Sequence, residues 1–211
     1  MIPKIIHQIW LGPKQPPNQL IQTWKDKHPE SKGWTHKLWT EKDLDSFNMV
    51  NIDYFNKTES YPQKADIWRY EILYKHGGIF CDADSACINP FDNTFLNNDS
   101  FACFENETVR SILISNGYIG ATKNNKLMAK LIDKINKLEY VDYKLPGKDP
   151  WIITGPWLFT NTVLQSFYPI KIYPSYYFIP EHFTGVKYYG NDKIYATQYW
   201  GNTLQKYDEI N

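Results

Sequence analysis

Cysteine is scarce in this sequence of 211 residues, which contains only Cys81, Cys87 and Cys103 and no Cys-x-x-Cys pair. An odd number of cysteines without paired spacing disfavours both a disulfide framework and a zinc site. No stretch approaches the about 18 consecutive apolar residues that a membrane-spanning helix needs. The first residues lack the apolar core of a signal peptide, so we expect a cytoplasmic protein without a transmembrane segment.

The chain also lacks an excess of either charge, because 23 Lys and Arg residues balance 23 Asp and Glu residues. Proteins that bind nucleic acid through its phosphates usually carry a basic excess, so we expect no nucleic-acid partner. Among the 23 basic residues only Arg69 and Arg110 are arginine. A guanidinium offers a bidentate fork that lysine lacks, which makes both arginines candidates for specific roles.

The order of predicted elements alternates strands and helices. A hydrophobic content of 42% excludes a disordered chain, and the absence of a linker predicts a single domain over 1–211. We expect strands over 4–11, 35–39 and 79–81, a strand pair or turn over 112–121, a strand-like tail over 170–199, and helices over 20–27, 41–48, 61–76, 126–138 and 157–167. This alternation predicts an α/β fold with a mostly parallel sheet flanked by helices.

The helix over 61–76 has the clearest signals at both ends. Ser60 occupies the N-cap position with Gln63 at the capping-box position, and Gly77 follows the last turn. One stripe at helical spacing predicts the buried face: Tyr61, Ala65, Trp68 and Ile72.

Two Asp-x-Asp pairs occur in the chain. Asp43 and Asp45 lie in a predicted helix, where positions i and i+2 point apart and cannot share one ion. Asp82 and Asp84 instead follow a predicted strand, and in extended backbone i and i+2 share a face. The carboxyl ends of strands bind ligands in open α/β sheets, and paired carboxylates suit Mg²⁺ or Mn²⁺. The alternative for this pair is a solvated acidic turn.

Asp66 and Arg69 stand at i, i+3 on the helix that leads through Gly77-Gly78 into the strand before Asp82. An ordinary helical ion pair is one interpretation. The other is a sugar-binding pair, because a carboxylate accepts hydrogen bonds from hydroxyl groups and a guanidinium donates to them.

The segment KADIWRYEILYKHGGIFCDADSACINPF over 64–91 resembles the DXD-containing sugar-binding region of a retaining glycosyltransferase family. That family includes fungal initiating α-mannosyltransferases, bacterial capsular glycosyltransferases and, more distantly, the glucosyltransferase domains of large clostridial toxins. The segments PKIIHQIWLG and LWTEKDL and the Thr154-Gly155-Pro156 triplet are similar to further elements of the family.

The resemblance implies a single-domain GT-A fold, the nucleotide-diphospho-sugar transferase fold. It implies a metal-dependent enzyme that uses Mn²⁺ or Mg²⁺ and a nucleotide-diphosphate sugar, with UDP favoured over GDP. The sugar would pass to a glycan or another hydroxyl acceptor, with retention of configuration.

The resemblance also implies roles for single residues. Trp10 would stack on the base, with His7, Gln8 and Ala83 at the nucleotide or sugar. Asp66 and Arg69 would hold donor-sugar hydroxyls. Asp82 would contact the ribose and metal-bound water, and Asp84 would ligate the metal directly. The stretch 198–203 replaces a His-containing family pattern, so Asn202 is the expected third metal ligand.

Several alternatives stay open. His7 could instead be a hydrogen-bonded core histidine. A phosphatase of the haloacid dehalogenase type also begins with a strand and Asp-x-Asp, and a related chain could bind nucleotide sugar without turnover. The tyrosines over 173–189 could line an acceptor groove or fill the core, and we expect an inert, buried Cys81. We expect core positions for Trp24, Trp34, Trp151 and Trp157.

Overall fold

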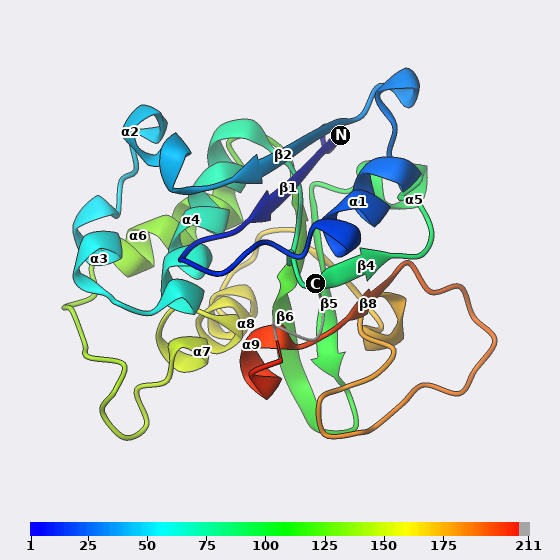
Figure 1. Cartoon of the computed structure of the whole chain (residues 1–211). Helices are drawn as coiled ribbons and strands as arrows, with labels where there is room; N and C mark the ends of the chain where they lie inside the picture. Colours follow the sequence, from blue (N-terminus) through cyan, green and yellow to red (C-terminus); the bar gives the residue numbers. More distant parts are fainter. Residues whose placement is uncertain (207–211) are drawn as a thin grey trace.

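The computed structural model describes residues 1–206, and a six-stranded sheet runs through them (Figure 1). The strands follow the order β2 (Thr35–Trp39), β1 (Ile5–Ile9), β3 (Gly78–Cys81), β6 (Arg110–Ala121), β5 (Ser100–Asn106) and β7 (Lys171–Tyr173). Neighbours pair in parallel except at β6, which runs antiparallel to both β3 and β5. Every strand but β6 therefore points the same way, and the predicted mostly parallel α/β fold is confirmed.

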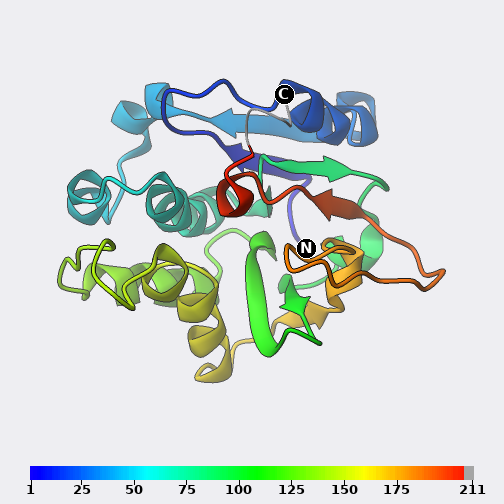
Figure 2. The same cartoon turned by 60° about the horizontal axis from the view of Figure 1, so that its bottom comes forward.

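A second, two-stranded sheet joins the middle of the chain to its end. Strand β4 (Ser85–Cys87) pairs antiparallel with β8 (Ala196–Gln198), and Ser85 lies opposite Gln198. Helix α9 (Gly201–Leu204) follows β8 and lies beside this small sheet (Figure 2). This pairing carries the residues after β8 to the Asp-x-Asp turn that precedes β4.

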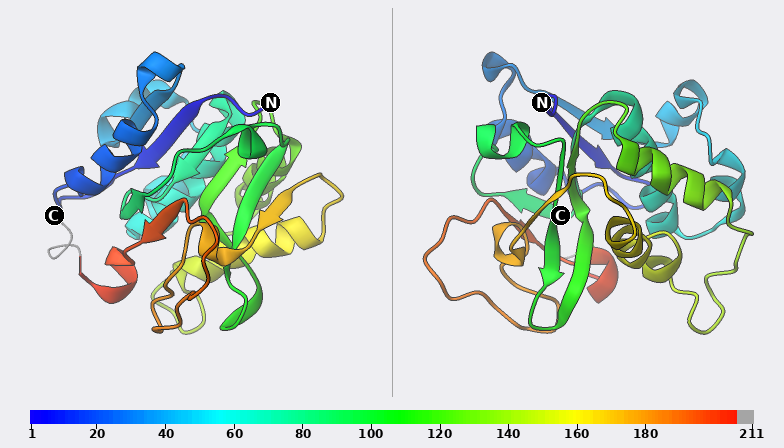
Figure 3. Two further views of the ribbon diagram at one scale, coloured as in Figure 1. Left: turned by 90° about the vertical axis from the view of Figure 1, so that its right-hand side faces the viewer. Right: turned by 180° about the vertical axis from the view of Figure 1, so that it is seen from behind.

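Helices cover both faces of the large sheet, and each face has its own core. The helices are α1 (Asn18–Lys27), α2 (Leu44–Phe47), α3 (Ile52–Lys57), α4 (Tyr61–His76), α5 (Asn93–Leu96), α6 (Lys126–Asn136), α7 (Pro150–Ile153) and α8 (Pro156–Leu164). One core gathers around Trp68 of α4 together with α6 and α8, which lie side by side behind the sheet (Figure 3). The other core gathers around Trp24 of α1 and Phe95 of α5.

Helix α4 begins and ends as its sequence predicts. The Ser60 hydroxyl accepts a hydrogen bond from the Gln63 amide, and Gly77 ends the helix at a positive φ of 65°. Tyr61 departs from the prediction, because its side chain is 45% exposed rather than buried. It stands on the first turn, beyond the core that Trp68 and Ile72 enter.

Two other sequence predictions need correction. Residues 112–121 belong to the single strand β6 rather than to a strand pair or turn, because the strand is buried from Leu113 onward between two packed layers. The tail over 170–199 forms strands only at β7 and β8, with one isolated bridge between Glu181 and Lys187. Its aromatic side chains fill the second core from irregular backbone. No helix within residues 1–206 is long and apolar enough to cross a membrane.

Candidate functional site

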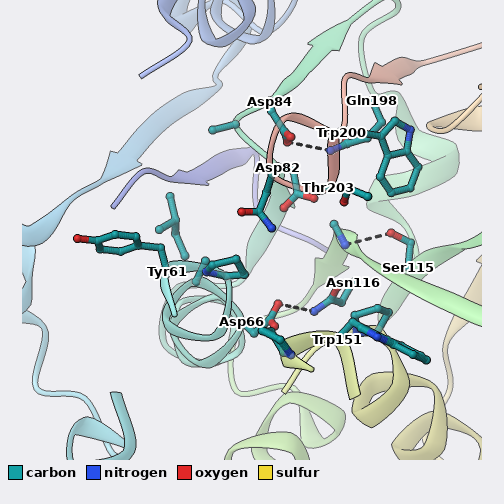
Figure 4. Close-up of a pocket in the computed structure, with 18 of the residues that line it drawn as sticks. Tyr61, Asp66, Asp82, Asp84, Ser115, Asn116, Trp151, Gln198, Trp200 and Thr203 are labelled. Carbon is teal, nitrogen blue, oxygen red and sulfur yellow. Dashed lines mark hydrogen bonds between the residues drawn. The ribbon is translucent and has the colours of Figure 1, made fainter. Parts of the chain in front are cut away.

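A pocket of about 700 Å³ opens at the ends of β1 and β3 (Figure 4). Ile9 and Trp10 reach it from the end of β1, and Asp82 reaches it from the end of β3. The carboxyl ends of parallel strands are where α/β sheets bind ligands, and this volume suits a small-molecule site.

The Asp-x-Asp pair lies at the centre of this pocket. Asp82, Ala83 and Asp84 all line it, but residues 83–84 form a turn rather than the extended backbone that the sequence suggested. Asp84 is 8% exposed, whereas the side chain of Asp82 keeps 29% of its surface exposed. Both carboxylates thus line one pocket, and the charge of Asp82 is one of the causes that raise the pKa of Asp84.

Arg69 connects two carboxylates in the floor of the pocket. Its Nη2 atom lies 3.2 Å from Oδ1 of Asp66, and its Nη1 atom lies 3.2 Å from Oδ1 of Asp82. Nη1 also donates to the backbone carbonyl of Asn116 at 2.6 Å, and the guanidinium stacks on the ring of Phe80. Asp66 and Arg69 therefore form the helical ion pair of the first interpretation, and both residues also line the pocket.

Asp66 is held by neutral donors as well as by Arg69. The side-chain amide of Asn116 donates to Oδ1 at 2.8 Å, and the hydroxyl of Thr154 donates to Oδ2 at 3.0 Å. Gly155 lets this segment approach, because a Cβ there would lie 2.7 Å from Cα of Trp151 and 3.1 Å from Asp66 Oδ2. These contacts fix the orientation of the Asp66 carboxylate.

Burial dominates the electrostatics of these acids. It raises the pKa of Asp66 to about 6, although Arg69, Asn116 and Thr154 act in the opposite direction. Burial and the Asp82 carboxylate raise the pKa of Asp84 to about 7. Up to three negative charges thus face the single positive charge of Arg69, and a cation beside Asp82 and Asp84 would offset the excess.

The segment after β8 covers Asp84. Gln198 Nε2 donates to Asp84 Oδ1 at 2.8 Å, and the Gly201 amide donates to Oδ2 at 2.8 Å. Trp200 adopts a left-handed φ of 57°, which is uncommon for a bulky side chain and turns the Gly201 amide toward the carboxylate. Gln198 Oε1 accepts from the Tyr118 hydroxyl at 2.8 Å, so Gln198 positions Asp84 rather than offering its oxygen to a metal.

The donor set fits a hard divalent cation. Residues 1–206 contain no group of three or more His, Cys, Asp and Glu side chains that could hold a metal. Asp82 and Asp84 would supply two carboxylates, and Asn202 and Thr203, which also line the pocket, could supply neutral oxygens. Oxygen ligands with room for water and phosphate suit Mg²⁺ or Mn²⁺.

Two residues that were predicted to bind the nucleotide do not reach the pocket. His7 is 1% exposed, donates from Nε2 to the Gly77 carbonyl at 2.8 Å and accepts from Trp39 at Nδ1. Gln8 is fully buried, and its Nε2 donates to the Asp82 carbonyl. The pleat of β1 turns both side chains into the protein, so His7 is the core histidine of the alternative and Gln8 supports the Asp82 backbone.

The tryptophans divide between core and pocket. Trp24 and Trp34 are buried as predicted, whereas Trp151 and Trp157 are each 37% exposed, and Trp151 lines the pocket together with Trp10. Among residues 1–206, no tyrosine of the 173–189 segment lines the pocket. Cys81 is buried as predicted, and burial raises the pKa of its thiol.

The structure also adds residues that sequence reasoning missed. Asn116 links Asp66 to Arg69, and Gly117 leaves the space that Asp82 occupies, since a Cβ there would lie 2.4 Å from Oδ2. One sequence signal could have found them, because Ser115-Asn116-Gly117 interrupts the otherwise apolar run of β6.

Comparison with known proteins gives the site a family context. Residues 15–102 match the family described as a glycosyltransferase sugar-binding region containing a DXD motif. The inositol phosphoceramide mannosyltransferase 1 of Schizosaccharomyces pombe is 28% identical over 207 residues, which cover 90% of this chain and 63% of the yeast protein. The chain thus spans less than two thirds of that relative's length.

Two solved structures share the fold. The PaToxG glycosyltransferase aligns with a TM-score of 0.59 and 22% identity, covering 78% of this chain and 69% of its own. The UDP-bound glycosyltransferase domain of the YGT toxin aligns with a TM-score of 0.52 and 11% identity, covering 82% and 79%. The sheet order and these likenesses confirm the expected GT-A type of fold.

Proposed function

Because residues 15–102 match the glycosyltransferase sugar-binding region that contains the DXD motif, we propose that the protein transfers a sugar from a nucleotide-diphosphate donor to a hydroxyl acceptor with the help of Mn²⁺ or Mg²⁺. A UDP-sugar is the favoured donor, and the UDP-bound YGT toxin domain of the same fold supports this choice. The acceptor is a glycan or another hydroxyl compound. A haloacid-dehalogenase-type phosphatase is no longer an alternative, because the family match is to glycosyltransferases.

A single observation carries the proposal. The Asp82 carboxylate stands between Arg69 and the open pocket, with Asp84 held beside it by Gln198 and Gly201. Two oriented carboxylates that share one pocket and repel each other favour a divalent cation and the diphosphate that such a cation binds. Arg69, Gln198 and Gly201 orient these two carboxylates, and a solvated acidic turn would not require such contacts.

The remaining residues have roles that follow from their positions. Trp10 would cover the base, because its ring lines the pocket at the end of β1. Asp66 and Arg69 would contact donor-sugar hydroxyls at the pocket floor. When bound, the divalent cation would neutralise the charge that develops on the departing diphosphate.

Retention of configuration forms part of the proposal. The Asp66 carboxylate already pairs with Arg69 and accepts hydrogen bonds from Asn116 and Thr154, which makes it a poor general base. The donor phosphate oxygen would take the acceptor proton while the sugar–phosphate bond breaks and the sugar–acceptor bond forms on the same face. Proton NMR of the first product tests this, since an inverted anomeric signal would contradict it.

Release of nucleoside diphosphate from UDP-glucose, UDP-galactose, UDP-N-acetylglucosamine and GDP-mannose tests the activity directly. With Mn²⁺ or Mg²⁺ present, we expect one donor to be hydrolysed slowly without acceptor and the rate to vanish with EDTA. Asp84→Asn is expected to lower the rate by about 100-fold or more, on the scale of losing a metal-ligating group.

The second Asp-x-Asp pair offers the matched control. Asp45 is exposed on α2, outside the pocket, so Asp45→Asn should retain the wild-type rate. If the wild type binds nucleotide sugar but releases no diphosphate with any donor, the protein is the binding homologue without turnover. Equal rates in Asp84→Asn and Asp45→Asn would contradict the role of the Asp82–Asp84 pair.

A further inference from the structure

The pocket extends well beyond the acidic centre. Tyr61 stands on one side of Asp66 and Asp82, and Trp151 and Trp200 stand on the other (Figure 4). Trp10, which the proposed function assigns to the base, also lines this pocket. The proposed function assigns no donor contact to Trp151 or to the aromatic and charged side chains around it.

Arg110 is the most distinctive residue on that side. Its guanidinium lies 4.8 Å from the ring centre of Trp151 and 6.0 Å from that of Phe183. Within residues 1–206 its hydrogen bond is to Glu105, at 3.3 Å from Nη1. The planar guanidinium lies near both rings and uses only Nη1 for Glu105, so its other N–H donors can form hydrogen bonds to a ligand in a fork geometry.

Glu105 supplies the complementary acceptor. Its side chain is nearly buried, and Oε1 accepts from both Arg110 and Nε2 of His182, at 3.3 Å and 3.2 Å. Nδ1 of His182 lies 2.8 Å from the Thr184 hydroxyl and 3.3 Å from the Thr184 amide, and in the tautomer that accepts at Nδ1 the Nε2 proton is donated to Glu105. Because both contacts use Oε1, the Oε2 atom can accept a hydrogen bond from a ligand in the pocket.

Aromatic surface frames these polar groups. Trp151 is 37% exposed, and Phe183 packs edge to face against Trp200 at 5.1 Å. A pyranose ring presents apolar C–H faces to such rings and hydroxyls to donors and acceptors at its rim. Glu105 compensates the charge of Arg110, and Asp149 also lines this side, so an anionic ligand is disfavoured.

We propose that Arg110, Glu105, Trp151 and Phe183 form an acceptor subsite for a neutral saccharide. This inference rests on the proposed function, because it treats the acidic centre as the place where the donor sugar sits. The saccharide stacks on the aromatic rings and directs one hydroxyl toward the centre, while Arg110 and Glu105 hold the others.

Saturation-transfer NMR with methyl α-glucoside, methyl α-mannoside and methyl α-galactoside tests the subsite on the full chain with UDP and diamagnetic Mg²⁺ present. We expect at least one glycoside to bind the wild type. Trp151→Ala should weaken that binding by about fivefold, the order of one aromatic contact. Arg110→Lys should weaken it as well, because lysine keeps the charge but loses the fork.

Trp157 provides the matched control, since it is also 37% exposed, contacts Trp151 edge to face and does not line the pocket. Trp157→Ala should bind the glycoside as the wild type does, and melting temperatures verify that each variant is folded. UDP bound without any glycoside, equal binding by Trp151→Ala and Trp157→Ala, or preferential binding of glucose 6-phosphate would each overturn the subsite. Failure to bind UDP would instead count against the proposed function.

Discussion

The Nη1 atom of Arg69 lies 3.2 Å from Oδ1 of Asp82, which joins the middle of α4 to the first acid of the Asp-x-Asp pair. The same guanidinium pairs with Asp66 one helical turn earlier. A buried cation thereby orients two carboxylates that both line the pocket. Loss of Arg69 should therefore lower the stability of the fold and also alter the orientation of Asp66 and Asp82 in the pocket.

Replacing Arg69 with methionine leaves Asp66 and Asp82 without their buried cation. Breaking a buried ion pair by removing one partner costs about 3–5 kcal/mol, and the exposure of Asp82 places the expected loss at about 3 kcal/mol at pH 8. The loss should shrink at pH 5, because Asp66, whose pKa is about 6, is then protonated. Urea unfolding at both pH values measures the change in free energy of unfolding.

Arg110→Met is the control for this substitution, since Arg110 is the other arginine of the chain and is half exposed. We expect a loss of about 1 kcal/mol, because Arg110 keeps 37% of its side-chain surface exposed and His182 still donates to the nearly buried Glu105. Equal losses in the two variants, or a loss in Arg69→Met that is independent of pH, would contradict the role of Arg69.

Gly117 and Gly120 lie on the same strand but border different features. A Cβ at position 117 would meet Asp82 Oδ2 at 2.4 Å, whereas a Cβ at position 120 would meet the buried Phe101 ring at 2.1 Å. Gly117→Ala should therefore weaken metal-dependent nucleotide binding by about tenfold with little loss of stability. Gly120→Ala should destabilise the fold by about 1–3 kcal/mol through overpacking.

Thermal unfolding and UDP titration of both variants measure these two effects. A large stability loss in Gly117→Ala with intact binding would show that Gly117 serves the core rather than Asp82. Comparison of the two variants also tests whether nucleotide binding depends on the position of the Asp82 side chain, because Gly117→Ala retains the Asp82 carboxylate.

Three histidines should make the fold sensitive to acid: His7 and His28, which are buried, and His36, which is half-buried. Burial lowers the pKa of His7, His28 and His36 to about 4. Unfolded histidine takes up its proton near pH 6.5, whereas the folded residue does so near pH 4, so this stability is present above pH 6.5 and is lost between pH 6.5 and 4. Each histidine contributes a slope of about 1.4 kcal/mol per pH unit in that range.

His28 isolates one of these contributions. Its Nδ1 atom donates to the Trp24 carbonyl at 3.0 Å and its Nε2 atom accepts from the Phe91 amide at 2.9 Å, so the neutral ring is fully satisfied. His28→Gln should reduce the slope of unfolding free energy against pH by about 1.4 kcal/mol per unit. Parallel slopes for variant and wild type, measured by urea unfolding from pH 7 to 5, would contradict this assignment.

Local sequence signals predicted the elements that carry the site. The cap at Ser60 and the stop at Gly77 define α4, and the apolar run at 79–81 places the Asp-x-Asp pair at the end of β3. These signals are local, because caps, helical periodicity and glycine turns depend on a few neighbouring residues.

The long-range partners could not be predicted in the same way. Gln198 reaches Asp84 across 114 positions, and Asn116 reaches Asp66 across 50. Such contacts depend on which strands pair, and the pairing of β4 with β8 leaves no local pattern in the sequence. The burial of Gln8 was also missed, since a strand that is buried on both faces shows no alternation of apolar and polar residues.

The central claim is that Asp82 and Asp84 bind nucleotide through a divalent cation. Calorimetric titration with UDP and with GDP, each with and without Mn²⁺, tests it most directly on wild type, Asp84→Asn, Asn202→Ala and the control Asp45→Asn. We expect one nucleotide to bind wild type and Asp45→Asn at least about tenfold more tightly with Mn²⁺, and this enhancement to be lost in Asp84→Asn and reduced in Asn202→Ala. Binding that is unaffected by Mn²⁺, or an enhancement that survives in Asp84→Asn, would contradict the account.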